Sequence, residues 1–344
     1  METISQASSG NLPIELVFLI VKYAAEPTFA QPDQYEAKNP YSTARTLCLV
    51  SRAVRRIALP EMLHTVLLGF HNVTAFVHAL SMQKAYAQKN PGLCLAYTRH
   101  IRNIWIGKFC VGPELIPEHS SFGTSVPESA IDLFAPVLLA APSLAIDFSS
   151  MDLLTCCVDH AWTRMSKDID RECLPPPWST KTLTISGMVI TPWRITALAS
   201  RSAFLASVAH LIVLSHTESS SNLHVIRRAA GTIGPRDYNL PRWMTHAPWA
   251  SFKKLETISL VFPHVKPPLD VFAFSTGMDL PVELLTFPAS LVKGHRVPLE
   301  IKASTETGEG HISLNDVRVV VSDFQVHFCV FCHEWDKVWA RIVG

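Results

Sequence analysis

The fold of this chain is decided by Leu12-Pro13-Ile14-Glu15-Leu16-Val17-Phe18-Leu19-Ile20-Val21 and by the later stretch Leu47-Cys48-Leu49-Val50-Ser51-Arg52. Proline suits the first turn of a helix, because the N–H that it lacks would have no partner there. Every side chain from 16 to 21 is apolar, and Glu15 and Lys22 are the only charges between Leu12 and Ala25. A helix this apolar on all sides must be buried on several faces at once. The sequence therefore predicts a helix that packs within its own domain and also against another chain.

The later stretch predicts a second helical stripe. Apolar side chains recur at helical spacing at Leu47, Val50, Val54 and Ile57. The stripe is expected to stop at Pro60, since the proline ring clashes inside a helix. Arginines occupy the remaining surface, and they favour either contact with an acidic partner surface or simple solubility of the module. Three of them are expected on one helical face: Arg45, Arg52 and Arg56.

Together the two stretches resemble an F-box, and the similarity continues through Leu59-Pro60-Glu61-Met62-Leu63-His64-Thr65-Val66-Leu67-Leu68. The chain looks like the large class of F-box-like proteins of mushroom-forming fungi. In that class a loop of variable length separates the first helix from the second, and residues 26–41 would be that loop here. Residues 315–321 and 336–341 look like the closing strand and the aromatic helix of the same class. The sequence departs from the wider F-box pattern in the long loop and in having no tryptophan after Val50-Ser51-Arg52.

The resemblance implies a substrate-recognition subunit of a Skp–cullin–F-box ubiquitin ligase, located in the cytoplasm or the nucleus. Such a subunit is not an enzyme and needs no cofactor, because it only holds a target protein near the ubiquitin-charged partner. Its partners would be the Skp adaptor, the cullin ligase core and a target protein. The residues implied to contact the Skp adaptor are Leu12, Pro13, Leu16, Ile20, Leu47, Val50 and Ile57.

The composition argues against nucleic-acid binding, membrane insertion and export. The 344 residues carry 30 basic and 29 acidic side chains, so the net charge of +1 supplies no basic excess for binding nucleic acid by counterion release. No apolar run approaches the roughly 20 residues that span a bilayer, and the N-terminus has no basic secretory leader. Without export, the eight cysteines are expected to be reduced thiols.

The chain is expected to be organised as a tail over 1–11, an F-box-like domain over 12–68, a linking helix over 69–97 and an α/β domain over 98–344. The expected fold class is mixed α+β and α/β: a small helical F-box-like module followed by an irregular α/β solenoid similar to leucine-rich repeats. Alternating apolar residues would fill the interior of the solenoid while polar residues line the outer face of the sheet. Apolar triplets predict strands at 101–106, 208–213, 255–260 and 314–319, with weaker copies at 144–146, 183–185 and 299–301. Helices are expected between them at 129–141, 194–206 and 222–230.

One motif suggests different chemistry. Cys329-Val330-Phe331-Cys332-His333 has the spacing of a c-type haem attachment site, but haem attachment needs an export route that this chain lacks. A zinc or redox site would use His327, Cys329, Cys332 and His333, although no second C-x-x-C accompanies them. The simpler interpretation is a buried strand in which cysteine serves as a small apolar side chain.

Two alternatives to the ligase subunit stay open. The missing tryptophan and the long loop favour an interaction scaffold that has kept the fold and lost ligase recruitment. The C-x-x-C-H motif favours a zinc or redox protein. The chain contains no H-E-x-x-H, G-x-S-x-G or G-x-x-x-x-G-K-[ST] pattern that would organise its histidines and serines into a known active site.

Overall fold

The computed structural model describes residues 12–27, 29, 39–89, 95–107, 128–165, 176–187, 199–214, 235–239, 244, 247–263, 278–293, 300–304, 318–328 and 334–343. The chain divides into two compact units, an N-terminal unit of residues 1–65 and a C-terminal unit of residues 66–344. None of the described helices combines the length and the apolar character needed to span a membrane.

The N-terminal unit is built from three helices, α1 (Ile14–Ala25), α3 (Ser42–Val50) and α4 (Arg52–His64), and α1 packs against both of the others. The predicted first helix is confirmed: Pro13 is its cap residue, and its carbonyl accepts a hydrogen bond from the backbone N–H of Leu16 at 2.9 Å. The buried core is made of small side chains, with larger neighbours packed around it. Its fully buried members are Val21, Ala25, Ala44 and Ala58.

The prediction of one continuous second stripe ending at Pro60 is wrong on two points. First, the chain turns at Ser51, whose extended backbone (φ −159°, ψ 166°) separates α3 from α4. The Ser51 hydroxyl accepts a hydrogen bond from the Val54 N–H at 3.2 Å, so it caps α4. Second, α4 runs through Pro60 to His64, although the proline cannot donate the bond to the carbonyl four residues earlier and its ring crowds that carbonyl. Arg45 therefore lies on a different helix from Arg52 and Arg56.

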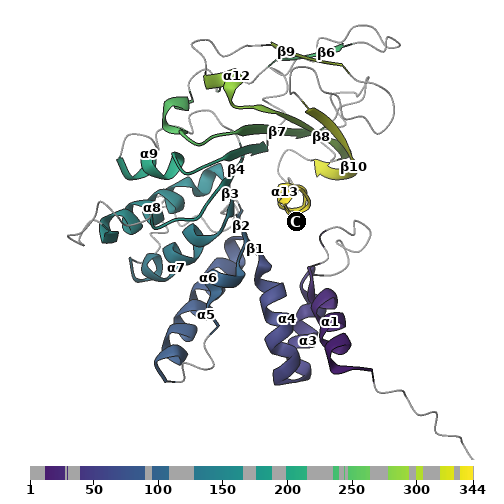
Figure 1. Ribbon diagram of the computed structural model, residues 1–344, viewed down its shortest axis with the longest axis vertical. Coiled ribbons are helices and arrows are strands. Elements are labelled where there is room, and N and C mark those ends of the chain that lie inside the picture. Colours follow the sequence, from purple (N-terminus) through teal and green to yellow (C-terminus); the bar gives the residue numbers. More distant parts are fainter. Residues whose placement is uncertain are drawn as a thin grey trace, which may run out of the picture. The chain divides into compact units, whose positions relative to one another are not determined.

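The C-terminal unit is organised around an eight-stranded sheet with the order β1-β2-β3-β4-β5-β7-β8-β10 (Figure 1). This confirms the mixed α/β fold class. The strands of the sheet are β1 (Thr65–Leu68), β2 (Asn103–Ile106), β3 (Ser143–Asp147), β4 (Thr182–Ser186), β5 (His210–Leu214), β7 (Thr257–Pro263), β8 (Met278–Pro288) and β10 (Arg318–Phe328).

The order of the strands in the sheet follows their order in the chain. The pairs β2–β3, β3–β4, β4–β5 and β5–β7 are parallel, and β7–β8 and β8–β10 are antiparallel. Parallel neighbours need a crossover segment. The helices of this unit are α5 (Phe70–Lys89), α6 (Tyr97–His100), α7 (Glu128–Ala140), α8 (Met151–Met165), α9 (Ala199–Leu205), α12 (Ser290–Lys293) and α13 (Trp335–Val343). The crossovers before β3, β4 and β5 contain α7, α8 and α9, whereas the described part of the β5–β7 crossover contains strand β6 (Pro235–Asn239) and a short 3-10 helix at Trp249–Ser251.

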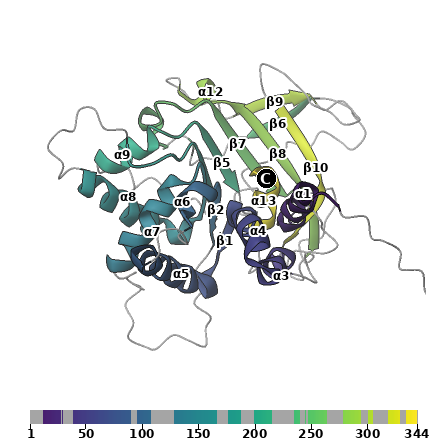
Figure 2. The ribbon, with the colours of Figure 1, turned by 60° about the horizontal axis from the view of Figure 1, so that its bottom comes forward.

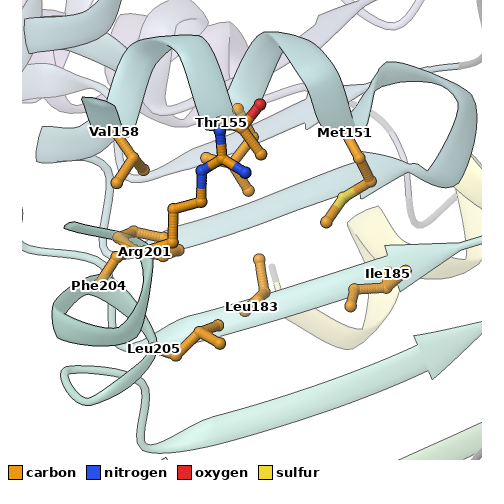
Figure 3. Close-up of a pocket in the computed structure, with 9 residues that line it drawn as sticks. Met151, Thr155, Val158, Leu183, Ile185, Arg201, Phe204 and Leu205 are labelled. Carbon is orange, nitrogen blue, oxygen red and sulfur yellow. The ribbon is translucent and has the colours of Figure 1, made fainter. Parts of the chain in front are cut away.

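Helices α7, α8 and α9 lie on one side of the strands and α13 lies on the other, as Figures 1 and 2 show from two directions. The seam between α8, α9 and β4 contains an enclosed cavity of only about 10 Å³, hardly room for one water molecule. In Figure 3, Leu183 and Ile185 of β4 lie on the side of the strand that lines this cavity, with Ile185 beneath Met151 of α8. The even-numbered residues of β4 therefore face away from the helices, because successive side chains of a strand alternate.

Most of the predicted strands are confirmed, since 101–106, 144–146, 183–185, 208–213 and 255–260 coincide with β2, β3, β4, β5 and β7. The triplet at 299–301 falls in β9 (Glu300–Ser304), which pairs with β6 (Pro235–Asn239) in a separate two-stranded sheet. Strand β8 was not predicted, although it continues the main sheet. Of the triplet at 314–319, residues 318 and 319 begin β10, and the earlier residues lie outside the described ranges.

The helix at 129–141 is confirmed as α7, and α9 occupies the later part of 194–206. The expected helix at 222–230 lies outside the described residues. Helix α8 was not predicted, because its polar face and the adjacent Cys156 and Cys157 do not give an obvious apolar stripe. The closing strand and aromatic helix implied by the resemblance correspond to β10 and α13.

Candidate partner-docking face

Helix α1 presents a stripe of large apolar side chains to solvent. Leu16, Leu19, Ile20 and Tyr23 follow the spacing i, i+3, i+4, i+7, so they share one face of the helix. Between 45% and 63% of each side chain is exposed. We call these four residues the apolar stripe. A soluble domain rarely leaves a continuous apolar face uncovered without a partner to bind there.

The opposite face of α1 forms the core of its unit. Val21 and Ala25 are buried against Ala44 of α3 and Ala58 of α4. Because three of these four side chains are alanines, the helices can approach closely. This cluster therefore contains few of the large apolar side chains of the unit. An ion pair of 3.7 Å between Lys22 and Glu61 joins α1 to α4 at the surface. The larger apolar residues of α1 are thereby left over for the outer face.

The end of α3 adds two more exposed apolar side chains, Leu49 and Val50, at 79% and 65% exposure. The turn that follows is held by two contacts. Arg55 Nε donates a hydrogen bond to the Cys48 carbonyl oxygen at 3.0 Å, and Ser51 caps α4. These contacts fix the C-terminal end of α3, so Leu49 and Val50 are presented on a rigid corner.

The seven residues that the resemblance implied for Skp contact divide into two groups. Exposed side chains, available to a partner, belong to Leu12, Pro13, Leu16, Ile20 and Val50. Leu47 and Ile57 are half-buried and pack against the core of the N-terminal unit. The structure therefore brings the second group into the fold of the module and not onto its outer face.

Four exposed apolar residues of the N-terminal unit were missed in the sequence: Leu19, Tyr23, Leu49 and Ile14. For the first two the signal was present, because 16, 19, 20 and 23 already have helical spacing. It was hidden by the uniform apolarity of α1, in which the buried and the exposed stripes look alike. Leu49 could not be assigned without the turn at Ser51, which sets where α3 ends.

The surface of α3 and α4 is basic. The segment 42–64 carries four arginines and one acid, and all four arginines are exposed: Arg45, Arg52, Arg55 and Arg56. The Arg55 side chain is committed to the Cys48 carbonyl, while its charge remains at the surface. A partner that covers the apolar stripe and also carries acidic side chains would find both chemistries on this unit.

The metal and redox candidates receive no support from the described structure. His327 lies in β10, and Cys329, Cys332 and His333 lie outside the described residues. Among the residues that the structure does describe, no group of three His, Cys, Asp or Glu side chains could hold a metal ion. Cys156 and Cys157 follow each other in α8, and burial together with the neighbouring Cys156 raises the pKa of the Cys157 thiol to about 12.

The C-terminal unit also contains an open groove of about 670 Å³ along α7 and α8. Two of the side chains that line it approach the Asp132 carboxylate: His160 Nε2 at 2.8 Å and Arg164 Nη1 at 3.8 Å. The histidine contact has the distance of an ion pair but not the geometry of a hydrogen bond. Both of these basic side chains are thus directed at an acid of the same unit, and the remaining walls are alanine, proline and methionine. The groove offers no set of groups aimed at a ligand.

Comparison with known proteins gives no match: no protein-family model fits the sequence, and no curated protein or solved structure is significantly similar to it. The argument for function therefore depends on the residues themselves.

Proposed function

We propose that this protein is a substrate-recognition subunit of a Skp–cullin–F-box ubiquitin ligase. Its N-terminal unit docks on the Skp adaptor through the apolar stripe of α1, the preceding Leu12 and Pro13, and the Leu49–Val50 corner of α3. The observation that carries the proposal is the exposure of the stripe, opposite a core of small residues. An amphipathic helix whose apolar side chains lie at i, i+3, i+4 and i+7 is a recurring means of docking into a partner's groove.

The proposal assigns distinct roles to the two half-buried residues. Leu47 and Ile57 hold α3 and α4 against α1, so they support the docking face without contacting the adaptor. The exposed arginines of α3 and α4 favour an acidic adaptor surface and would raise the rate of association more than the final affinity.

We further propose that the C-terminal unit is a divergent solenoid similar to leucine-rich repeats and that it holds the target protein. Support comes from the chain-ordered strands and their helical crossovers, with helices on one side. The first residues of five strands are in register and polar. This polar row crosses the sheet from β2 to β7 as Asn103, Ser143, Thr182, His210 and Thr257.

Docking is tested with the full chain and purified Skp adaptor, by co-purification and by calorimetry. The double variant Leu16→Glu, Ile20→Glu places two carboxylates in the stripe. Burial of one such side chain is worth about 1.5–3 kcal/mol, so we expect the affinity to fall by about 100-fold or more. Thermal unfolding should stay nearly unchanged, since both side chains face solvent.

The matched control is Met82→Glu, Tyr86→Glu, which introduces the same two charges at exposed positions one turn apart on α5 in the C-terminal unit. We expect this variant to bind the adaptor as the natural chain does. The proposal fails if the natural chain does not bind the adaptor, or if the stripe variant and the control bind equally well. Binding to the adaptor with no cullin in the assembled complex would instead favour the scaffold without ligase recruitment.

A further inference from the structure

The sheet of the C-terminal unit has a face that the helical crossovers do not cover. Leu183 and Ile185 of β4 point toward α8 and α9, so Thr184 between them points to the other side. Thr184 is in register with Ala145 of β3, which is in register with Trp105 of β2. Trp105, Ala145, Thr184 and Ser143 therefore share this face, which we call the open face.

Helix α13 lies on the open face. The ring of Trp339 is 5.6 Å from the ring of Trp105, and Figures 1 and 2 both place α13 on the side of the strands away from α7, α8 and α9. Trp335 and Trp339 are one turn apart, and both are essentially fully buried, together with Val338. A single face of α13 thus holds two large aromatic side chains against the sheet.

The polar groups of α13 and those of the open face are poorly matched to one another. The indole N–H groups of Trp335 and Trp339 are buried with no hydrogen-bond partner within the described structure. The same holds for the hydroxyls of Ser143 and Thr184. A buried polar group without a partner weakens the state that buries it. All four belong either to α13 or to the face on which it lies.

The short length of α13 also indicates that its docked state is weakly held. It has nine residues, fewer than the roughly 12–15 that even a helix-favouring sequence needs to be helical in water. It is therefore helical only while it is docked. Short terminal elements whose order depends on one contact surface open more easily than the strands beneath them.

We propose that α13 is an exchangeable occupant of the open face, and that a partner's amphipathic helix with two large aromatic side chains at i and i+4 binds in its place. The site is the part of the open face around Trp105 and Ala145, together with the hydroxyls of Ser143 and Thr184, which have no hydrogen-bond partner among the described residues. A partner helix with polar side chains beside its aromatic pair would satisfy groups that α13 leaves unsatisfied. Release of α13 would then control when the face is open.

The first test measures hydrogen exchange in the intact chain by mass spectrometry. We expect the amides of 335–343 to exchange at least about 100-fold faster than those of β3 and β4, because α13 undocks without unfolding the sheet. Equal protection of α13 and the two strands would overturn the proposal, since α13 would then open only with the whole unit.

The second test uses a labelled peptide with the sequence of residues 334–344 and the full chain carrying Trp339→Ala. The variant weakens the internal helix and raises the fraction of chains with an open face, so we expect the peptide to bind it at least about tenfold more tightly than the natural chain. A peptide in which both tryptophans are alanine is the control and should bind neither. Equal binding to the two chains, or binding to neither, contradicts the proposal.

If Trp339→Ala does not fold, the exchange measurement on the natural chain decides alone. Neither test contains a ligase component, so their failure leaves the proposed adaptor docking untouched.

Discussion

The two units of this protein place their large apolar side chains in opposite ways. In the N-terminal unit the cluster at the centre of the three helices consists of three alanines and one valine, while leucine, isoleucine and tyrosine face solvent along α1. In the C-terminal unit the large side chains are inside, and the open face of the sheet, which combines Trp105 with the polar Ser143 and Thr184, is covered by α13. The hydrophobicity of a segment therefore does not tell which of its faces is buried within the chain and which is available to a partner.

The largest difference between the two units is expected in the stability lost when a leucine is replaced by alanine. Leu144 of β3 has no exposed area, and Leu144→Ala should lower the free energy of unfolding of the C-terminal unit by about 2–5 kcal/mol. Leu16→Ala in the stripe should change stability by no more than about 0.5 kcal/mol. Chemical denaturation of both variants checks this, and a large loss for Leu16→Ala would show that the stripe is part of a core.

The stability of the N-terminal unit is instead expected to be sensitive to added side-chain volume, because its core is made of small residues. Ala58 has no exposed area where α4 meets α1, so Ala58→Leu should destabilise this unit by about 1–3 kcal/mol through overpacking. Ala53 is exposed on the same helix and serves as the control, with Ala53→Leu expected to be nearly neutral. Thermal unfolding of the two variants should differ clearly, and identical curves would mean that the helices are not closely packed.

A smaller effect is expected on the open face. Thr184→Val keeps the shape of the side chain and removes a buried hydroxyl that has no partner in the described structure. Such a change is typically neutral to stabilising, here by up to about 1 kcal/mol. Exchange of the α13 amides should slow accordingly. Faster exchange in this variant would indicate that the hydroxyl is satisfied, and that α13 fits its site better than we infer.

The smallest expected effect concerns the reactivity of the cysteine thiols, which is compared in the natural chain without any substitution. The pKa of Cys157 is about 12, so at pH 8 only about one thiol in ten thousand is ionised and alkylation is negligible. Its neighbour Cys156 is exposed, and Cys48 of the N-terminal unit is half-buried with its pKa raised by burial. Mass spectrometry after iodoacetamide treatment should find Cys156 labelled first and Cys157 last. Prompt labelling of Cys157 would show that α8 opens readily.

Much of the fold could be predicted from the sequence. The strands β2, β3, β4, β5 and β7 follow from alternating apolar residues, and α1 follows from Pro13 and the run after it. What could not be predicted depends on tertiary context. Pro60 lies inside α4 although its ring disfavours that position, and β8 continues the sheet by pairing with residues far away in the chain.

The sequence predicts where the candidate site lies better than it predicts which side chains face solvent there. The sequence identified α1 and the end of α3 as a docking region, but periodicity cannot separate two apolar stripes on one helix. Leu47 and Ile57 were therefore grouped with residues that face solvent, and Leu19 and Tyr23 were overlooked. Only the packing of α1 against Ala44 and Ala58 distinguishes its inner face from its outer one.

The chain order of the strands has a consequence for synthesis. A nascent chain that emerges from the ribosome can add each strand of the main sheet to the one before it, because β1 to β10 are neighbours in the order of translation. Helix α13 comes after all of them, about 120 residues beyond β5. At roughly 5–20 residues per second, that delay is on the order of 6–24 seconds. For this interval Trp105 lacks the cover that Trp339 of α13 provides, and molecular chaperones have their opportunity to bind there.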